Sequence, residues 1–94
     1  MRFKQFKVGD RIINNHIEVD NILLKNNLGW LCDAEIENAD IEVKNKTIIW
    51  NNGIFYAGHW VYGIWKDGFF HGVWDNGIWE GGNFNGTWKS GIKK

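Results

Sequence analysis

The sequence has no proline, one cysteine and no apolar segment of membrane-spanning length. The single cysteine, Cys32, excludes an internal disulfide and a thiolate metal cage. No apolar run approaches the roughly 20 residues of a transmembrane helix, so no membrane span is predicted. Proline interrupts strand pairing, and its absence is consistent with a chain that consists mostly of paired strands and turns.

Net charge and a targeting signal are also lacking. The sequence has 11 lysine and arginine residues and 11 aspartate and glutamate residues, so we expect neither nucleic acid nor a membrane as a partner. The basic residues Arg2, Lys4 and Lys7 break up the first apolar residues, and no signal peptide is predicted. We expect cytoplasmic synthesis.

Residues that support catalysis are few and scattered. His16, His59 and His71 fall at unlike positions, which gives no spacing argument for a shared metal site. Cys32 has no base partner in a recognisable motif and is expected to be a small buried residue. The phosphate-binding glycine patterns GxGxxG and GxxxxGK(S/T) do not occur. We therefore predict that the protein is not an enzyme and has no catalytic residues, no cofactor and no metal site.

What the sequence does contain is a repeat. Residues 49–91 are three copies of one unit, 15, 14 and 14 residues long, that agree at three aromatic columns. The columns are Trp50, Trp65 and Trp79, then Phe55, Phe70 and Phe84, then Trp60, Trp74 and Trp88. A glycine precedes each aromatic residue from Phe55 to Trp88 of these columns by two positions: Gly53, Gly58, Gly63, Gly68, Gly72, Gly77, Gly82 and Gly86. We predict that both sets are structural.

The Gly-x-aromatic pattern predicts a short extended segment that follows a turn. Residues two apart on a strand lie on one face, so the glycine would leave space for the ring two residues later. Asn52, Asp67 and Asn76 precede such glycines and favour turns. The residue between glycine and ring is mostly β-branched or aromatic and would lie on the opposite face of the strand. Five of these middle residues form a candidate interaction face: Ile54, Ile64, Phe69, Val73 and Ile78.

The first half of the chain gives weaker signals. Residues 1–9 are predicted to be an edge strand or an attachment arm, and residues 8–13 a turn that enters a strand. From residue 16, apolar and polar residues alternate between asparagine-rich breaks, which favours short strands. A helix is the alternative for residues 31–43, where alanine and glutamate are frequent. We prefer strand there, because Ala34-x-Ile36 and Ala39-x-Ile41 repeat the small-x-large pattern of the later glycines and rings.

The chain resembles three kinds of repeat protein. Ala34-Glu35-Ile36-Glu37-Asn38 and Ala39-Asp40-Ile41-Glu42-Val43 are similar to the units of pentapeptide-repeat proteins, which implies a parallel β-solenoid. Tyr56-x-Gly58-x-Trp60-x-x-Gly63, Phe70-x-Gly72-x-Trp74-x-x-Gly77 and Phe84-x-Gly86-x-Trp88-x-x-Gly91 resemble the core of MORN repeats, which implies an antiparallel meander. Arrays of Trp-x-x-Gly-x-Phe units also look like those in bacteriophage structural proteins.

We predict an all-β fold, a short-repeat parallel β-solenoid, with the MORN-like antiparallel β-meander as the alternative. Two-residue strands are too short for a meander but can pair with coils above and below. Strand and coil spacings leave too little room for three large rings inside a coil of 14 residues, so we expect either about 20 residues over four sides or one column that faces outward. One domain is expected over residues 1–94: N-terminal strands or an attachment segment at 1–33, an Ala-x-Ile segment at 34–48, the repeats at 49–91 and a tail at 92–94.

These features predict a structural or assembly protein, a small phage virion component that offers a β-repeat docking surface. Protein partners are expected, in a homo-oligomer or larger assembly, because repeat ends leave open strand edges. The first alternative is a carbohydrate-binding module in which an exposed aromatic column stacks on a glycan. The second is a DNA-mimic inhibitor of the pentapeptide-repeat type, against which the neutral net charge argues.

Overall fold

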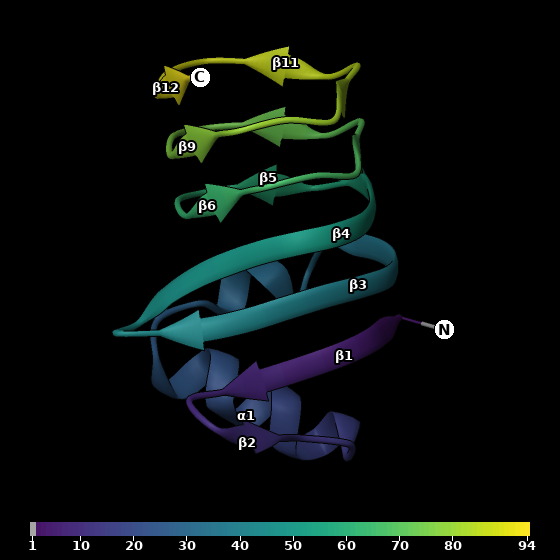
Figure 1. The fold of residues 1–94 in the computed structure, drawn as a ribbon, viewed down its shortest axis with the longest axis vertical. Coiled ribbons are helices and arrows are strands. Elements are labelled where there is room, and N and C mark those ends of the chain that lie inside the picture. The colour runs from purple at the N-terminus through teal and green to yellow at the C-terminus, as the bar shows by residue number, and fades with distance from the viewer. Residues whose placement is uncertain (1) are drawn as a thin grey trace.

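The computed structural model describes residues 2–94 (Figure 1). Two long strands, β3 (Glu35–Lys44) and β4 (Thr47–Ala57), form an antiparallel hairpin in the middle of the molecule. β1 (Phe3–Val8) lies parallel to β3 and turns back into the short β2 (Arg11–Ile12). Beyond β4 come two-residue strands: β5 (His59–Trp60), β6 (Ile64–Trp65), β7 (Phe69–Phe70), β8 (Val73–Trp74), β9 (Ile78–Trp79), β10 (Asn83–Phe84), β11 (Thr87–Trp88) and β12 (Ile92–Lys93).

The two-residue strands wind into a three-sided parallel β-solenoid, as Figure 1 shows above β4. Side A consists of the first part of β4 with β6, β9 and β12, and side B of the last part of β4 with β7 and β10. Side C consists of β5, β8 and β11. All pairs between coils are parallel, so the predicted solenoid is confirmed and the antiparallel meander is wrong.

Backbone hydrogen bonds between coils explain why such short strands are stable. The Gly63 carbonyl accepts from the Ile78 N–H at 2.9 Å, and the Trp65 carbonyl accepts from the Glu80 N–H at 2.8 Å. The same pair of bonds recurs on every side, so each coil is paired with the coil below it and the coil above it. A strand two residues long is sufficient because the pairing accumulates along the stack rather than along the strand.

The long strands bend at the same corner as the solenoid. On β4, Trp50 belongs to side A and Phe55 to side B, with Gly53 at the corner between them. The β3–β4 register shifts between Glu37 and Asp40, and the β1–β3 register shifts between Phe3 and Gln5. Such irregularities bend strands. The strands β1 to β4, here called the N-terminal sheet, therefore continue sides A and B below the coils. Within this sheet β1 lies between β3 and β2, whereas the sequence predicted an edge strand.

A helix lies where the sequence predicted short strands over residues 16–33. Helix α1 (His16–Lys25) begins after Asn15, whose side-chain oxygen accepts from the N–H groups of Ile17 at 2.9 Å and Glu18 at 3.2 Å. Val19 and Leu23, one helical turn apart, are buried. The strand prediction was wrong because it treated Ile17 as an inward residue, whereas that side chain is 64% exposed.

The rest of the N-terminal prediction has a mixed outcome. A 3-10 turn, η1 (Gly29–Leu31), follows the helix and contacts β5 below side C, where Trp30 packs edge-on against Trp60 at 5.2 Å. The strand preferred over a helix after residue 34 is confirmed by β3, and the turn that enters a strand after residue 8 is confirmed by β2. Ala34, Ile36, Ala39 and Ile41 are all buried, as the small-x-large pattern requires for one face.

All three aromatic columns point into the solenoid. Trp50, Trp65 and Phe70 are fully buried, and only Phe84 and Trp88 in the last coil are partly exposed. Within a column the rings stack almost parallel, as in Trp50 on Trp65 at 4.7 Å and 10°. Between columns they meet edge to face, as in Trp65 with Phe70 at 5.4 Å and 87°.

The expectation of a larger coil or an outward column is therefore wrong. A centroid separation near 5 Å between parallel rings means that stacked rings are offset and tilted, so each can present its edge to the next column. Three rings arranged in this way fill a triangular cross-section that 14 residues can enclose. The expectation had assumed rings that lie side by side, which occupy more area.

Candidate functional site

The predicted aromatic columns form the interior of the solenoid. The rings of Trp50, Trp60, Trp65 and Trp74 are inaccessible, and their indole N–H groups have no hydrogen-bond partner among the described residues. Each of these rings has an edge-to-face neighbour, which is the favoured arrangement of aromatic pairs. No column of rings is available on the surface for stacking on a ligand.

The glycines serve a purpose that the sequence prediction only partly identified. A Cβ added at Gly68 would lie 2.2 Å from the carbonyl oxygen of Gly53 in the coil below, and one added at Gly77 would lie 2.4 Å from that of Gly63. At Gly72 the carbonyl of Gly58 and the ring of Phe55 are the nearest groups, at 2.6 and 2.7 Å. The glycines thus allow neighbouring coils to approach at the corners. The ring that follows two residues later is not among the nearest atoms.

The predicted interaction face is divided among three sides of the solenoid. Ile64 and Ile78 lie on side A, Ile54 and Phe69 on side B, and Val73 on side C. Their neighbours in β4, β6, β9, β7 and β8 point inward, so all five side chains are outward but do not form one surface.

Side A carries a longer apolar row than the prediction contained. Ile49, Ile64, Ile78 and Ile92 occupy equivalent positions in four successive strands, and we call this row the isoleucine stripe. The first three side chains are half-buried, and Ile92 is 59% exposed. The repeat alignment could have revealed the stripe. Ile49, Ile64 and Ile78 each directly precede a tryptophan of the first aromatic column, and Ile92 precedes Lys93, which occupies the equivalent position in the next strand.

Beside the stripe runs a row of polar residues. Asn51, Lys66, Glu80 and Lys94 each follow the inward residue of their strand on side A. The side-chain amide of Asn51 donates to Glu42 at 3.1 Å, which lowers the pKa of that carboxyl, with Lys44, Lys7 and Lys66 contributing smaller effects. The outer surface of side A therefore combines an apolar centre with a charged border.

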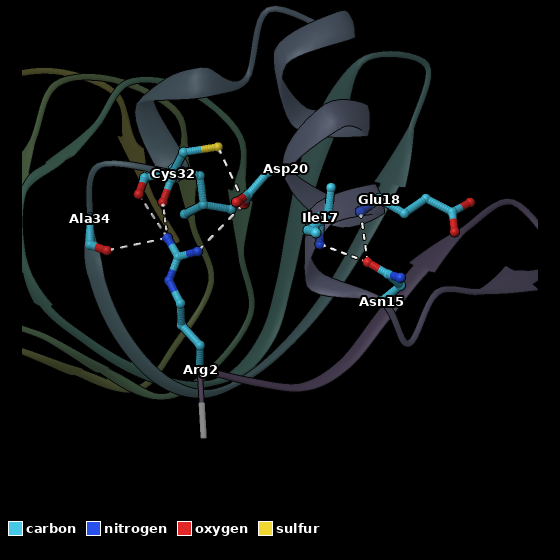
Figure 2. Close-up of polar contacts among 8 residues, drawn as sticks. Arg2, Asn15, Ile17, Glu18, Asp20, Cys32 and Ala34 are labelled. Carbon is cyan, nitrogen blue, oxygen red and sulfur yellow. Dashed lines mark hydrogen bonds and ion pairs between the residues drawn. The ribbon is translucent and has the colours of Figure 1, made fainter.

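Cys32 lies in a small polar network with Arg2 and Asp20 (Figure 2). The Arg2 guanidinium donates to the carbonyls of Leu31 at 3.0 Å and Cys32 at 2.9 Å, and lies 3.6 Å from Asp20. The Cys32 thiol donates to Asp20 at 3.7 Å, and burial together with that carboxylate raises the pKa of the thiol. A thiol that stays protonated at neutral pH is a poor nucleophile. Through its bonds to the Leu31 and Cys32 carbonyls, Arg2 also connects the start of β1 to the segment after α1.

The histidines remain separate, and His16, His59 and His71 are all exposed. His59 lies 3.3 Å from Asp75 in the coil above, and Lys89 in the next coil lies 3.8 Å from the same carboxylate. Among residues 2–94 no group of three metal-binding side chains comes together, and no helix is long and apolar enough to cross a membrane.

Two of the hollows on the surface of residues 2–94 are large enough for a small molecule. The first, about 510 Å³, lies between β1 and α1 with Phe3, Phe6 and Val19 in its walls, and the Arg2–Asp20 pair lies at its border. The second, about 430 Å³, lies over the corner between sides A and B and includes Asp40 and Phe69.

Comparison of the chain with protein-family models, curated proteins and solved structures finds no match.

Proposed function

We propose that this protein is a non-enzymatic structural component that docks onto protein surfaces, including copies of itself, through side A. The observation that carries the proposal is the isoleucine stripe, which places Ile49, Ile64, Ile78 and Ile92 in register on the outside of the solenoid. The solenoid itself does not need these residues to be apolar, since its interior is already filled by the three aromatic columns.

The stripe has the composition of an interface. Its members repeat at the strand spacing of about 4.8 Å and present a flat, rigid apolar strip. Lys66, Glu80 and Lys94 beside it alternate in sign, which gives the apolar centre a polar border. A second copy turned by a half rotation would bring its own stripe onto this one, with opposite charges able to pair across the border.

The assembly to which the protein belongs is proposed from the sequence. Arrays of Trp-x-x-Gly-x-Phe units resemble those of bacteriophage structural proteins, and on that resemblance we propose a small virion component. The carbohydrate-binding alternative assumed an exposed column of rings and loses its basis, because the columns are buried. The DNA-mimic alternative has no support in a chain whose formal net charge is zero.

Self-association is the direct test. The double variant Ile64→Thr, Ile78→Thr keeps β-branched shapes on side A but removes much of the apolar surface, and Ile54→Thr, Val73→Thr is the matched control on sides B and C. We expect sedimentation velocity to show concentration-dependent association for the wild type and the control and a monomer for the double variant. A wild type that stays monomeric at the highest soluble concentration would contradict docking between copies.

A further inference from the structure

The hollow over the corner between sides A and B has a feature that docking through side A does not use. It is lined by Lys4, Asn38, Asp40, Asn52, Ile54 and Phe69, with the backbone of Gly53 between them. We infer that this hollow, here called the corner hollow, binds a neutral saccharide. The inference is independent of the proposed docking function, because the corner hollow and the isoleucine stripe share no residue.

The corner hollow arises from the bend in the N-terminal sheet. Three of its residues lie in adjacent strands at points where the pairing is irregular: Lys4 in β1, Asn38 in β3 and Gly53 in β4. Phe69 comes from β7, which pairs with β4. Asn38 has a φ of 51° and Gly53 a φ of 122°, so neither continues the regular alternation of side chains. The row of outward residues is interrupted there, and a depression remains. Irregular strand positions of this kind often serve to direct side chains at binding sites.

Phe69 supplies an aromatic surface at one edge of the corner hollow. It is 49% exposed, although its equivalents in the coils below and above are Ile54 and Asn83. The solenoid therefore does not require a ring at this position. A phenyl ring held beside a depression is suited to contact with the apolar C–H face of a sugar ring, in the way that planar groups stack on exposed aromatic side chains.

The polar groups around Phe69 match the hydroxyl groups of a saccharide. The Asn52 side-chain oxygen accepts from the Gly53 N–H at 2.8 Å, which fixes the amide and leaves its N–H₂ group to donate. Asp40 and Lys4 make no side-chain hydrogen bond or ion pair with the residues that the structure describes. One carboxylate, one ammonium and two amides provide both donors and acceptors within a single depression.

Charge and size select the class of ligand. Lys4 and Asp40 balance each other, so the corner hollow has no net attraction for a phosphate or a polyanion. Its volume of about 430 Å³ falls within the usual range for small-molecule sites. It is also open to solvent, and a shallow site with one ring is expected to bind in the millimolar range.

The test uses ¹⁵N-labelled protein titrated separately with cellotriose, maltotriose and chitotriose at millimolar concentrations. At least one of them is expected to shift the amide resonances of Asn38, Asn52, Ile54 and Phe69 in a saturable manner. Phe69→Ala is expected to weaken that binding about tenfold or more, and Phe69→Tyr to retain it, since it keeps the ring. Tyr62→Ala removes an equally exposed ring at another corner and should leave binding unchanged.

Four results would overturn the inference. The first is the absence of localised shifts with all three trisaccharides, and the second is binding that Phe69→Ala does not weaken. The third is a larger response to inorganic phosphate than to the sugars, which would identify an anion site at Lys4. The fourth is movement of the same resonances with protein concentration alone, which would identify a contact between copies. Unchanged indole resonances in each variant show that the solenoid remains folded.

Discussion

At the level of single residues, the contact that decides the solenoid is between backbones. Gly68 approaches the carbonyl of Gly53, Gly82 approaches that of Gly68, and Gly91 approaches that of Gly77. A side chain at any of these positions would push two coils apart at a corner. Since every coil-to-coil hydrogen bond depends on that spacing, the loss would extend beyond the corner itself.

Replacement of Gly68 by alanine tests this explanation. Its φ is +121°, where a Cβ is strained, and the Cβ would lie 2.2 Å from the Gly53 oxygen. We expect Gly68→Ala to destabilise the protein by about 3 kcal/mol or more in urea unfolding. Gly81→Ala is the control, because Gly81 is outside the left-handed region and its nearest neighbour is 3.2 Å away; a change within about 1 kcal/mol is expected. Equal losses would show that coil contact is not the cause.

Glu42 gives a prediction on pH. The hydrogen bond from Asn51 lowers its pKa in the folded state, so its carboxylate contributes stability above the pKa of the unfolded chain. That contribution is lost as the pH falls below about 4.3, the ordinary glutamate value. Glu42→Gln should therefore reduce the slope of unfolding free energy against pH in this range, measured by urea titration at several pH values. Asn51→Ala, which removes the hydrogen-bond donor, should reduce the slope in the same way, and an unchanged slope in both variants would contradict this explanation.

At the level of elements, the sequence predicts what is periodic. Columns such as Trp60, Trp74 and Trp88 identify equivalent positions, and equivalent positions one coil apart must pair in parallel if the chain is a solenoid. Sequence alone did not predict how three rings share one coil, because offset stacking and edge-to-face contact are properties of the packed interior. It also could not select one outward face, because the side to which Phe69 or Val73 belongs depends on where the chain turns.

Helix α1 shows the limit of local patterns. Ile17 and Val19 fit strand alternation, whereas Val19 and Leu23 fit helical spacing, and the short segment satisfies both. The cap at Asn15 and burial of Val19 and Leu23 against the N-terminal sheet decide in favour of helix. The signal that could have revealed it is Asn15, a favoured N-cap residue, followed at the third position by Glu18.

The cap can be tested directly. Asn15→Ala removes the oxygen that accepts from Ile17 and Glu18, and a loss of about 1 kcal/mol in the free energy of unfolding is expected. Asn14→Ala, at the preceding exposed position, removes an amide that has no side-chain hydrogen bond with the described residues and should have little effect. Chemical denaturation followed by far-ultraviolet circular dichroism measures both. An equal effect of the two changes would contradict the assigned helix start.

At the level of the whole molecule, the solenoid and the N-terminal sheet share one core. Phe6 and Ile41 lie in register with Trp50, Trp65 and Trp79, so the first aromatic column continues downward with a smaller ring and an aliphatic side chain. Ile36 extends the second column in the same way below Phe55. These contacts join residues that are far apart in sequence. The hairpin of β3 and β4 is therefore the base on which the coils stack.

A stack of equivalent coils should tolerate the removal of a whole coil but not of half a coil. Deletion of Ile64–Gly77, which is 14 residues, joins Gly63 to Ile78 and brings Trp79 over Trp50, Phe84 over Phe55 and Trp88 over Trp60. We expect this variant to fold with a sheet spectrum and lower stability, and to be shorter by about 4.8 Å in small-angle scattering.

The matched variant lacks only Ile64–Phe70, seven residues, and joins Gly63 to His71. This deletion removes one strand from side A and one from side B, so the next strand of side C, β8, would have to occupy side A. The corner after β8, residues 75–77, has the same length as the corner from side A to side B, residues 66–68, so the chain could still turn there. Every later strand, however, would lie on a different side from the strands with which it now pairs. We expect it to unfold at lower urea than the 14-residue deletion. Equal stability of the two would mean that the coils do not stack as equivalent units and that the N-terminal base alone holds the fold.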